Sequence, residues 1–422
     1  MTTTLIVAIF ILGYAAITLE HSIKINKAAS ALVTGILCWT IYMLGGADAL
    51  AVNHALLEHM GELSGILFFL LGAMVIVELI DAHDGFDIIT SRISTDKKRP
   101  LLWIVATLAF FLSALLDNLT TTIVIVTLLR KLLAEREDRL LFTGITVIAA
   151  NAGGVWSPMG DVTTTMLWIG GQISVIPTIT SLIIPSMVCL IVPLIAVSSR
   201  LNGSFVAPLT RAQDHLSSSL FGRNAVFWIG VATLLFVPVF KTLTHLPPFM
   251  GILLGLGVMW VVTELIHSEK NEAEKGVLSV NHAIRKIDTP SILFFLGILL
   301  AISALQTSGI LGDVARWLDA RVGNVVAIGL IIGLLSAVFD NVPLVAAVQA
   351  MYPITQYPMD DFFWQFLAYT SGTGGSALII GSAAGIAAMG LEKINFFWYL
   401  RTISLLALIG YLSGAAVFVL LK

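Results

Sequence analysis

The sequence predicts an all-α polytopic membrane protein with about 10 transmembrane helices and two re-entrant hairpins in two inverted repeats. Three observations predict this fold: the composition, the number and length of the apolar segments, and motifs that recur in the second half of the chain. The chain has 422 residues, of which 57% are hydrophobic and 12% charged, with a mean hydropathy of +0.95. Soluble domains carry about 25% charged residues, so most of this surface must face lipid.

Charge and cysteine content exclude several classes of protein. The formal net charge is −3 and no basic tail is present, so nucleic acid is not an expected partner. Cys38 and Cys189 both lie in apolar segments, which excludes a disulfide framework and a cysteine metal cage. Residues 1–19 lack a basic region and a small-residue cleavage site, so they are interpreted as a span and not a signal peptide. Neither a cofactor nor an enzymatic activity is expected.

The apolar segments fall into two length classes. A spanning helix needs about 20 mostly apolar residues. Ten segments meet this requirement: 3–20, 28–46, 64–81, 140–170, 177–199, 224–240, 247–266, 291–308, 362–390 and 395–421. Two further stretches, 101–131 and 324–352, are too long for one upright helix and too short for two full crossings. A re-entrant hairpin that returns to the face it left fits this length, provided protein covers its turn.

Lys and Arg give the expected orientation. If both hairpins are re-entrant, one side of the membrane receives loops 21–27, 82–100, 130–139, 200–223, 267–286 and 392–401. These loops hold 19 of the 23 Lys and Arg residues, and the other side receives Lys241, Arg316, Arg321 and Lys422. The basic side is expected to be cytoplasmic, which places both termini outside.

Three matches in the same order relate the two halves of the chain. Residues 66–70 (ILFFL) match 292–296, residues 112–118 (LSALLDN) match 335–341 (LSAVFDN), and residues 151–154 (NAGG) align with 372–375 (GTGG). The offsets between the copies are 226, 223 and 221 residues. We therefore expect a first repeat at 1–199, a cytoplasmic linker at 200–223 and a second repeat at 224–422. The loop charges orient the repeats oppositely, and inverted repeats with interrupted helices indicate a transporter with a midplane substrate site.

The recurring motifs place acidic and amide side chains at membrane depth. Asp117-Asn118 and Asp340-Asn341 form the two hairpin tips, and each tip is expected to approach a break in the following span. The sequence predicts these breaks at residues 151–161 and 371–376, where Gly and Pro interrupt the helix.

The charge of the site indicates the cargo. Asp117, Asp161 and Asp340 are expected within the membrane, where an ionised carboxylate costs about 3 kcal/mol or more unless it is compensated. A cation or a proton compensates this charge, whereas an anionic substrate adds to it. A carboxylate that holds either H⁺ or Na⁺ makes the protein an exchanger by mutual exclusion.

Other polar side chains complete the predicted site with hard oxygen atoms, which suit Na⁺ or Li⁺. We expect Na⁺ at Asp117, Asn118, Asn151 and Asp161. The remaining candidate ligands in the two halves are Thr120, Thr121, Thr163, Thr164, Ser336, Asp340, Asn341, Ser371 and Thr373.

Each of these residues also has a purely structural interpretation. An Asp-Asn pair can cap the second helix of a hairpin, and Gly160-Asp161 can serve only to break a helix. Asp288, Thr289 and Pro290 first indicate a helix start, with a cap followed by proline. Glu78 lies near the cytoplasmic end of its span and has Ala304 as its repeat counterpart, so it is either a proton carrier or an ordinary interfacial acid.

On these motifs the chain resembles NhaD-type sodium/proton antiporters of the ion transporter superfamily over nearly its whole length. The resemblance rests on residues 115–122 (LLDNLTTT), 151–164 (NAGGVWSPMGDVTT), 339–343 (FDNVP) and 370–376 (TSGTGGS). Related dicarboxylate carriers have Ser-Asn-Thr at the hairpin tips, and in this chain Asp replaces the Ser in both tips. The resemblance implies an ion path through Asp117, Asn151, Asp161, Thr163, Thr164, Ser336, Asp340, Asn341 and Ser371. It also implies roles in activity or pH response for Glu78, Asp288 and Thr289.

The same resemblance implies a homodimeric, elevator-type protein of the bacterial inner membrane that exports Na⁺ or Li⁺ in exchange for protons. The second tip lacks the threonines of the first, so the stronger cation site is expected on the Asp117 side. The alternatives are an oxyanion exporter or organic-anion symporter on the same scaffold, an intramembrane aspartyl protease using Asp117 and Asp161, and a cation channel.

Overall fold

The computed structural model describes residues 2–46, 48–90, 95–205, 220–268, 276 and 278–422. Its first half comprises α1 (Thr2–Thr18), α2 (Glu20–Ile23), α3 (Lys27–Leu44), α4 (Ala49–Ala82), α5 (Asp87–Thr90), α6 (Lys98–Leu116), α7 (Asn118–Leu132), α8 (Arg136–Gly154), α9 (Val162–Ile169) and α10 (Val175–Ser198). Its second half comprises α11 (Leu220–Thr244), α12 (Pro248–Ile266), α14 (Val280–Lys286), α15 (Thr289–Thr307), α16 (Ile310–Arg321), α17 (Val325–Leu335), α18 (Asn341–Met351), α19 (Phe362–Gly374), α20 (Ala383–Glu392), α21 (Phe396–Thr402) and α22 (Ser404–Leu421).

The helical membrane fold is confirmed. Within the described ranges, eight helices are long and apolar enough to cross a membrane: α3, α4, α6, α10, α11, α12, α15 and α22. The 17-residue α1 is slightly shorter. The two predicted broken spans are indeed divided, the first into α8 and α9 and the second into α19 and α20.

Some predicted boundaries were wrong. The span expected at 64–81 belongs to the 34-residue α4, which starts at Ala49 because Asp48 caps it and the following residues favour helix despite their acids. The span expected at 395–421 is divided at Ile403 into α21 and α22. The 19-residue α6 is long enough to cross a membrane by itself, so length alone does not identify a hairpin arm.

Each predicted hairpin segment forms two helices that meet at its tip. Helices α6 and α7 pack against each other and are separated only by Asp117. Helices α17 and α18 are separated by the turn at residues 336–340. Most of the expected linker at 200–223 lies outside the described residues, and the division into 1–199 and 224–422 stays a prediction.

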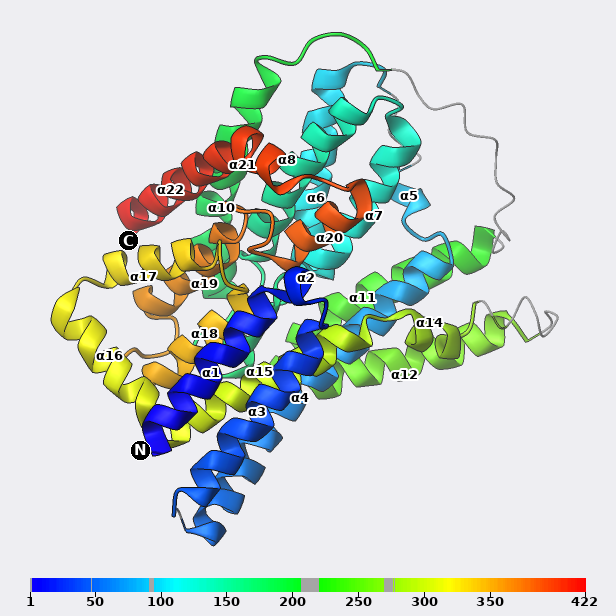
Figure 1. Ribbon diagram of the computed structural model, residues 1–422. Coiled ribbons are helices and arrows are strands. Elements are labelled where there is room, and N and C mark those ends of the chain that lie inside the picture. Colours follow the sequence, from blue (N-terminus) through cyan, green and yellow to red (C-terminus); the bar gives the residue numbers. More distant parts are fainter. Residues whose placement is uncertain (1, 47, 91–94, 206–219, 269–275, 277) are drawn as a thin grey trace.

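The helices form two bundles, each built from both halves of the chain (Figure 1). In the first bundle, α3 packs against α1 and α15, and α12 packs against α4 and α11. The second bundle contains α6, α7, α8, α10, α17, α19, α20 and α22, in which α6 packs on α8, α17 on α19, and α10 on α22. Helices α9 and α18 lie between the bundles, since α9 contacts α4 and α19, and α18 contacts α15 and α19.

The second bundle shows the repeat in its hydrogen bonds. Ser113 Oγ on α6 donates to the carbonyl oxygen of Ala150 over 2.6 Å, and Ser336 Oγ after α17 donates to that of Ser371, also over 2.6 Å. The two donors lie 223 positions apart in the sequence and the two acceptors 221 positions apart, which are the offsets between the repeated motifs. Each hairpin is therefore attached to its broken span in the same way.

Glycines at equivalent positions make the same close approach. A Cβ atom at Gly153 would lie 2.1 Å from the carbonyl oxygen of Phe110, and one at Gly374 would lie 2.0 Å from that of Gly333. Only a residue without a side chain fits at either position. The hairpins and broken spans are thus packed backbone against backbone, which brings the tips to the helix breaks.

Candidate cation site

Asp117 forms the first hairpin tip in an unusual backbone conformation. Its φ of 89° lies in the region that favours glycine, whereas a non-glycine residue there is strained. The carboxylate caps α7 by accepting hydrogen bonds from the Thr120 amide over 2.7 Å and from Thr120 Oγ1 over 3.1 Å. The chain keeps an aspartate where glycine would fit better, so its carboxylate has a use beyond turning the chain.

Asp340 forms the second tip without this strain. Its φ is −54°, and its Oδ1 caps α18 by accepting a hydrogen bond from the Val342 amide over 3.2 Å. Its other oxygen, Oδ2, lies 3.7 Å from Lys27 Nζ of α3. Both tips therefore cap a helix, as the structural interpretation required, but the two carboxylates differ in backbone strain and in charge compensation.

The helix breaks lie later in the chain than the sequence indicated. Residues 151–154 and 371–374 form the last turns of α8 and α19, and the breaks cover 155–161 and 375–382. The glycines lie within the helices, where they allow close packing against the hairpins, and the chain leaves the helix just after them. Each break exposes the carbonyl end of one helix and the amide end of the next to the site.

A chain of amide and hydroxyl groups joins the first tip to both breaks. Asn118 Nδ2 donates to Asn151 Oδ1 over 3.0 Å. Asn151 Nδ2 in turn donates to Ser376 Oγ and Ser382 Oγ, each over 2.9 Å. All four side chains are buried. Both asparagines were predicted site residues, whereas the two serines were not.

The second tip reaches the broken span of the other repeat. Asn341 Nδ2 donates to Asp161 Oδ2 over 3.2 Å, whereas the sequence placed it at the break of its own half. Asp161 also caps α9 by accepting a hydrogen bond from the Thr163 amide over 3.3 Å. Its repeat equivalent is Ser382, which caps α20. Of these two equivalent positions, only Asp161 therefore carries a carboxylate.

Asp161 is the most deeply buried of the three site carboxylates. It is 2% exposed, and within the described part of the chain no Lys or Arg forms an ion pair with it or with Asp117. Amide donors alone stabilise a carboxylate incompletely at this depth. The arrangement therefore requires a proton or a cation.

The predicted hydroxyl ligands divide into two groups. Thr121 Oγ1 and Thr163 Oγ1 are buried and have no hydrogen-bond partner among the described residues, so both can turn toward an ion. Of the other five, Thr120 donates to the Asp117 carboxylate. The remaining four form the second group and donate to backbone carbonyl oxygens: Thr164 to Asp161, Ser336 to Ser371, Ser371 to Leu367, and Thr373 to Tyr369. The protons of this second group hold the helix ends, and ion contact by their oxygens stays a prediction.

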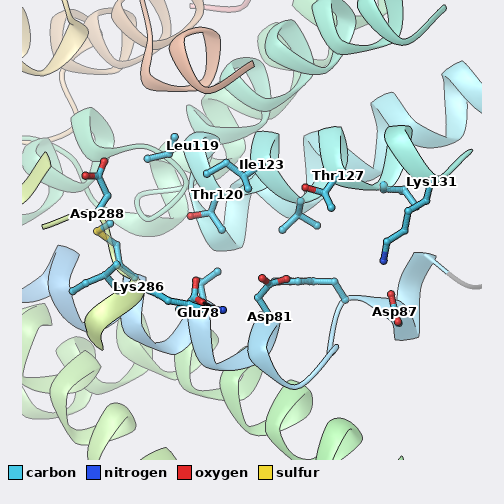
Figure 2. A pocket seen from close by; sticks show the side chains of 16 residues that line it. Glu78, Asp81, Asp87, Leu119, Thr120, Ile123, Thr127, Lys131, Lys286 and Asp288 are labelled. Atoms are coloured by element: carbon cyan, nitrogen blue, oxygen red, sulfur yellow. Dashed lines mark ion pairs between the residues drawn. The ribbon is translucent and has the colours of Figure 1, made fainter. Parts of the chain in front are cut away.

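An acidic cavity of about 230 Å³ lies beside the first tip (Figure 2). Among the described residues, four acids line it, namely Glu78, Asp81, Asp87 and Asp288, and two lysines balance them, Lys131 and Lys286. Figure 2 shows Thr120 and Thr127 of α7 facing Glu78 and Asp81 of α4. Since Thr120 also binds the Asp117 carboxylate, the cavity leads to the first tip.

Glu78 pairs with Lys286 Nζ over 3.3 Å in this cavity. Asp288 caps α15 by accepting a hydrogen bond from the Ser291 amide over 3.3 Å, and Thr289 is the first residue of that helix, so the helix-start interpretation is confirmed.

The sequence analysis did not identify Asp81, Asp87 and Lys131 as residues of this cavity. They lie at the end of a span or in loops, where charges are usually solvated.

Two further omissions have different causes. Lys27 looked like an ordinary loop residue, and only folding places it against Asp340. Ser382 had a signal in the sequence, since the repeat offset of 221 residues takes Asp161 to this position.

Comparisons with known proteins identify related transporters. The profile of the citrate transporter family (CitMHS) matches residues 4–374. Sodium/proton antiporter 1 of Arabidopsis thaliana is 50% identical over 414 residues, which cover 97% of this chain and 71% of the relative. Na(+)/H(+) antiporter NhaD of Vibrio cholerae is 30% identical over 445 aligned residues, covering 98% of this chain and 91% of the relative.

The fold also resembles a solved structure. The YdaH transporter of Alcanivorax borkumensis, described as having an unusual topology, superposes with a TM-score of 0.56 at 12% identity, covering 88% of this chain and 89% of that one. At this identity the likeness supports the fold alone.

Proposed function

We propose that this chain, which belongs to the citrate transporter (CitMHS) family, is a secondary active transporter that exchanges Na⁺ for H⁺. The relatives that support this cargo are antiporters of Arabidopsis thaliana and Vibrio cholerae, which match nearly the whole chain. The observation that carries the proposal is the Asp161 carboxylate, buried between the two halves and stabilised by amide donors, with no cationic partner among the described side chains.

Competition for this carboxylate produces the exchange. When Na⁺ binds, the carboxylate is ionised, and we propose the Asp117 carboxylate and the Thr121 and Thr163 hydroxyls as further hard oxygen ligands. When a proton binds, the charge is cancelled and Na⁺ loses its strongest ligand. The site can change its access from one side of the membrane to the other with either Na⁺ or a proton bound. Moving the uncompensated carboxylate costs too much free energy, so the two ions are exchanged in opposite directions. Li⁺ fits the same oxygen ligands and is proposed as an alternative cargo.

The acidic cavity is the proposed route from the cytoplasm. Its lining includes Lys131, Lys286 and Asp87, all in or beside segments that the loop charges assign to the cytoplasmic side. Its excess of acids raises the local concentration of cations. We place the protein in the bacterial inner membrane with both termini periplasmic. Labelling of a Lys422→Cys variant with a membrane-impermeant thiol reagent added to the periplasmic side would test this orientation.

Alternating access is proposed to occur by movement of the second bundle against the first, in a homodimer. Both tips and both breaks belong to the second bundle or to α9 and α18, which link it to the first. If α9 and α18 move with the second bundle, the entire site moves as one body. Cross-linking between α18 and α15 should therefore stop transport without preventing Na⁺ binding.

A second candidate function follows from the description of the family as citrate transporters. A Na⁺-coupled carrier of organic anions would use the same scaffold. The carboxylates at the tips and at Asp161 oppose it, because an anion in this site would add to their charge.

One experiment separates these functions. Protein in liposomes with an interior pH dye should show a Na⁺-dependent pH change that Asp161→Asn removes. Citrate uptake driven by Na⁺, measured with labelled citrate in the same liposomes, should be absent. No pH response to Na⁺ or Li⁺ would refute the exchange, and citrate uptake would establish the second candidate.

A further inference from the structure

Lys27 places a positive charge at the second hairpin tip. Its Nζ lies 3.7 Å from Asp340 Oδ2 and 4.4 Å from the centre of the Phe294 ring, so the ammonium group is held between a carboxylate and an aromatic face. The side chains of Lys27 and Asp340 are 23% and 17% exposed. The pair is largely desolvated, which makes its charges interact more strongly than those of a surface ion pair.

The start of α3 fixes the position of this lysine. Asn26 caps the helix by accepting a hydrogen bond from the Ala28 amide over 2.8 Å. Glu20 Oε1 accepts a hydrogen bond from the backbone amide of Lys27 over 3.0 Å, which leaves the side-chain ammonium for Asp340. Helix α3 packs along α15, where Gly297 approaches the backbone of Ala31 closely. The lysine thus extends from the first bundle toward a hairpin tip outside it.

The two tips share a small cavity. Lys27, Asp117, Asn118 and Asp340 all line one space of about 60 Å³. Asp117 has no ion pair among the described side chains, whereas Asp340 is compensated by the protein itself. A Na⁺ ion approaching this space therefore meets one available carboxylate and one that is already paired.

We propose that Lys27 is a tethered competitor of the transported cation, whose ammonium group occupies Asp340 and so prevents the second hairpin from binding its own Na⁺. This inference rests on the proposed Na⁺/H⁺ exchange and adds to it a residue that sets how many cations bind. The repeated motif supplies two acidic tips, and the lysine reserves one of them. Na⁺ can bind at Asp340 only when Lys27 leaves it.

The pair also joins parts that the proposed mechanism moves relative to each other. Lys27 belongs to the first bundle, and Asp340 begins α18, which links the bundles. Movement of the second bundle would stretch or break the pair. In the conformation described here, the lysine therefore both blocks a second cation and holds the tip in place.

Equilibrium binding of ²²Na⁺ to the purified full-length protein in detergent tests the inference. Lys27→Gln should leave Asp340 unpaired and bind about one additional Na⁺ per chain, because an uncompensated carboxylate at this depth recruits a cation. The double variant Lys27→Gln/Asp340→Asn should return to the wild-type amount. Lys27→Arg, which keeps the charge, should behave as the wild type does.

A second comparison covers the case in which Lys27→Gln does not fold. Asp340→Asn leaves an unpaired ammonium group facing the shared cavity, which should weaken Na⁺ binding at the first tip by roughly fivefold or more. Adding Lys27→Gln should restore the affinity, whereas a purely structural role for the lysine predicts no restoration.

The outcomes distinguish this inference from the proposed function. If the wild type binds Na⁺ and moves protons in response, but neither comparison changes Na⁺ binding as described, only the role of Lys27 is refuted. If the wild type binds no Na⁺ and shows no Na⁺-dependent proton movement, the exchange and the inference are both refuted.

Discussion

Asn341 donates a hydrogen bond of 3.2 Å to Asp161, a residue 180 positions earlier in the chain. The contact crosses the internal repeat, since the tip of the second hairpin meets the broken span of the first half. It ties the orientation of the buried carboxylate to the position of the second hairpin. Any movement of that hairpin relative to α9 must therefore change how Asp161 is stabilised, and through this contact the proposed exchange would couple ion binding to conformation.

The first prediction concerns Asp161 and its repeat equivalent, Ser382. Asp161→Asn keeps the size of the side chain and removes its charge, so Na⁺-dependent proton movement in liposomes should fall by at least about tenfold. Ser382→Ala, at the equivalent position, removes the cap of α20 and one of the two hydrogen bonds that Asn151 donates, but no charge, so it should lower stability by about 1–2 kcal/mol while Na⁺ dependence is retained. Equal loss of transport in both variants would contradict the assignment of the site to Asp161.

The second prediction concerns backbone strain at Asp117. Its φ of 89° favours glycine, so Asp117→Gly should be more stable than Asp117→Ala by about 1 kcal/mol in thermal unfolding in detergent. Both variants should lose Na⁺-dependent proton movement, because both lack the carboxylate. Asp340 is the matched control: with its φ of −54°, Asp340→Gly should be no more stable than Asp340→Ala. The same order of stabilities at both positions would contradict this account of the tip.

The third prediction concerns the glycines that let the hairpins approach their broken spans. Gly153→Ala and Gly374→Ala would each place a Cβ within about 2 Å of a carbonyl oxygen. Each should lower stability by about 1–3 kcal/mol, and by similar amounts because the contacts are repeats of each other. Gly61→Ala is the control, since nothing lies within 4 Å of its Cβ and it should be neutral or slightly stabilising.

The fourth prediction concerns the charge of the acidic cavity. Glu78→Gln removes one of its four acids and leaves Lys286 without this partner, so the apparent KM for Na⁺ should rise several-fold. Lys286→Gln should lower it, because the cavity becomes more negative. Both values are to be measured in liposomes at constant ionic strength, and both differences should shrink in high salt. Changes in the same direction would show that the pair acts structurally.

The sequence predicted the helical fold and its repeat because both depend on local properties. Apolar length marks the spans, and glycine and proline mark the helix breaks to within one or two turns. The errors arose where packing decides: Gly153 and Gly374 do not break their helices but allow a neighbouring backbone to approach closely. A helix boundary of this kind depends on a partner segment that a local pattern does not contain.

For the candidate site, the sequence by itself determined which chemical groups are present: Asp117 and Asp340 at the tips, Asn118, Asn151 and Asn341, and one further carboxylate at Asp161. Duplication of a motif leaves its trace in the order of residues, so the sequence could predict two related half-sites. Only the tertiary structure decided which groups meet. It brought Asn341 to Asp161 and Lys27 to Asp340, because burial and charge compensation depend on distances in space between segments far apart in the chain.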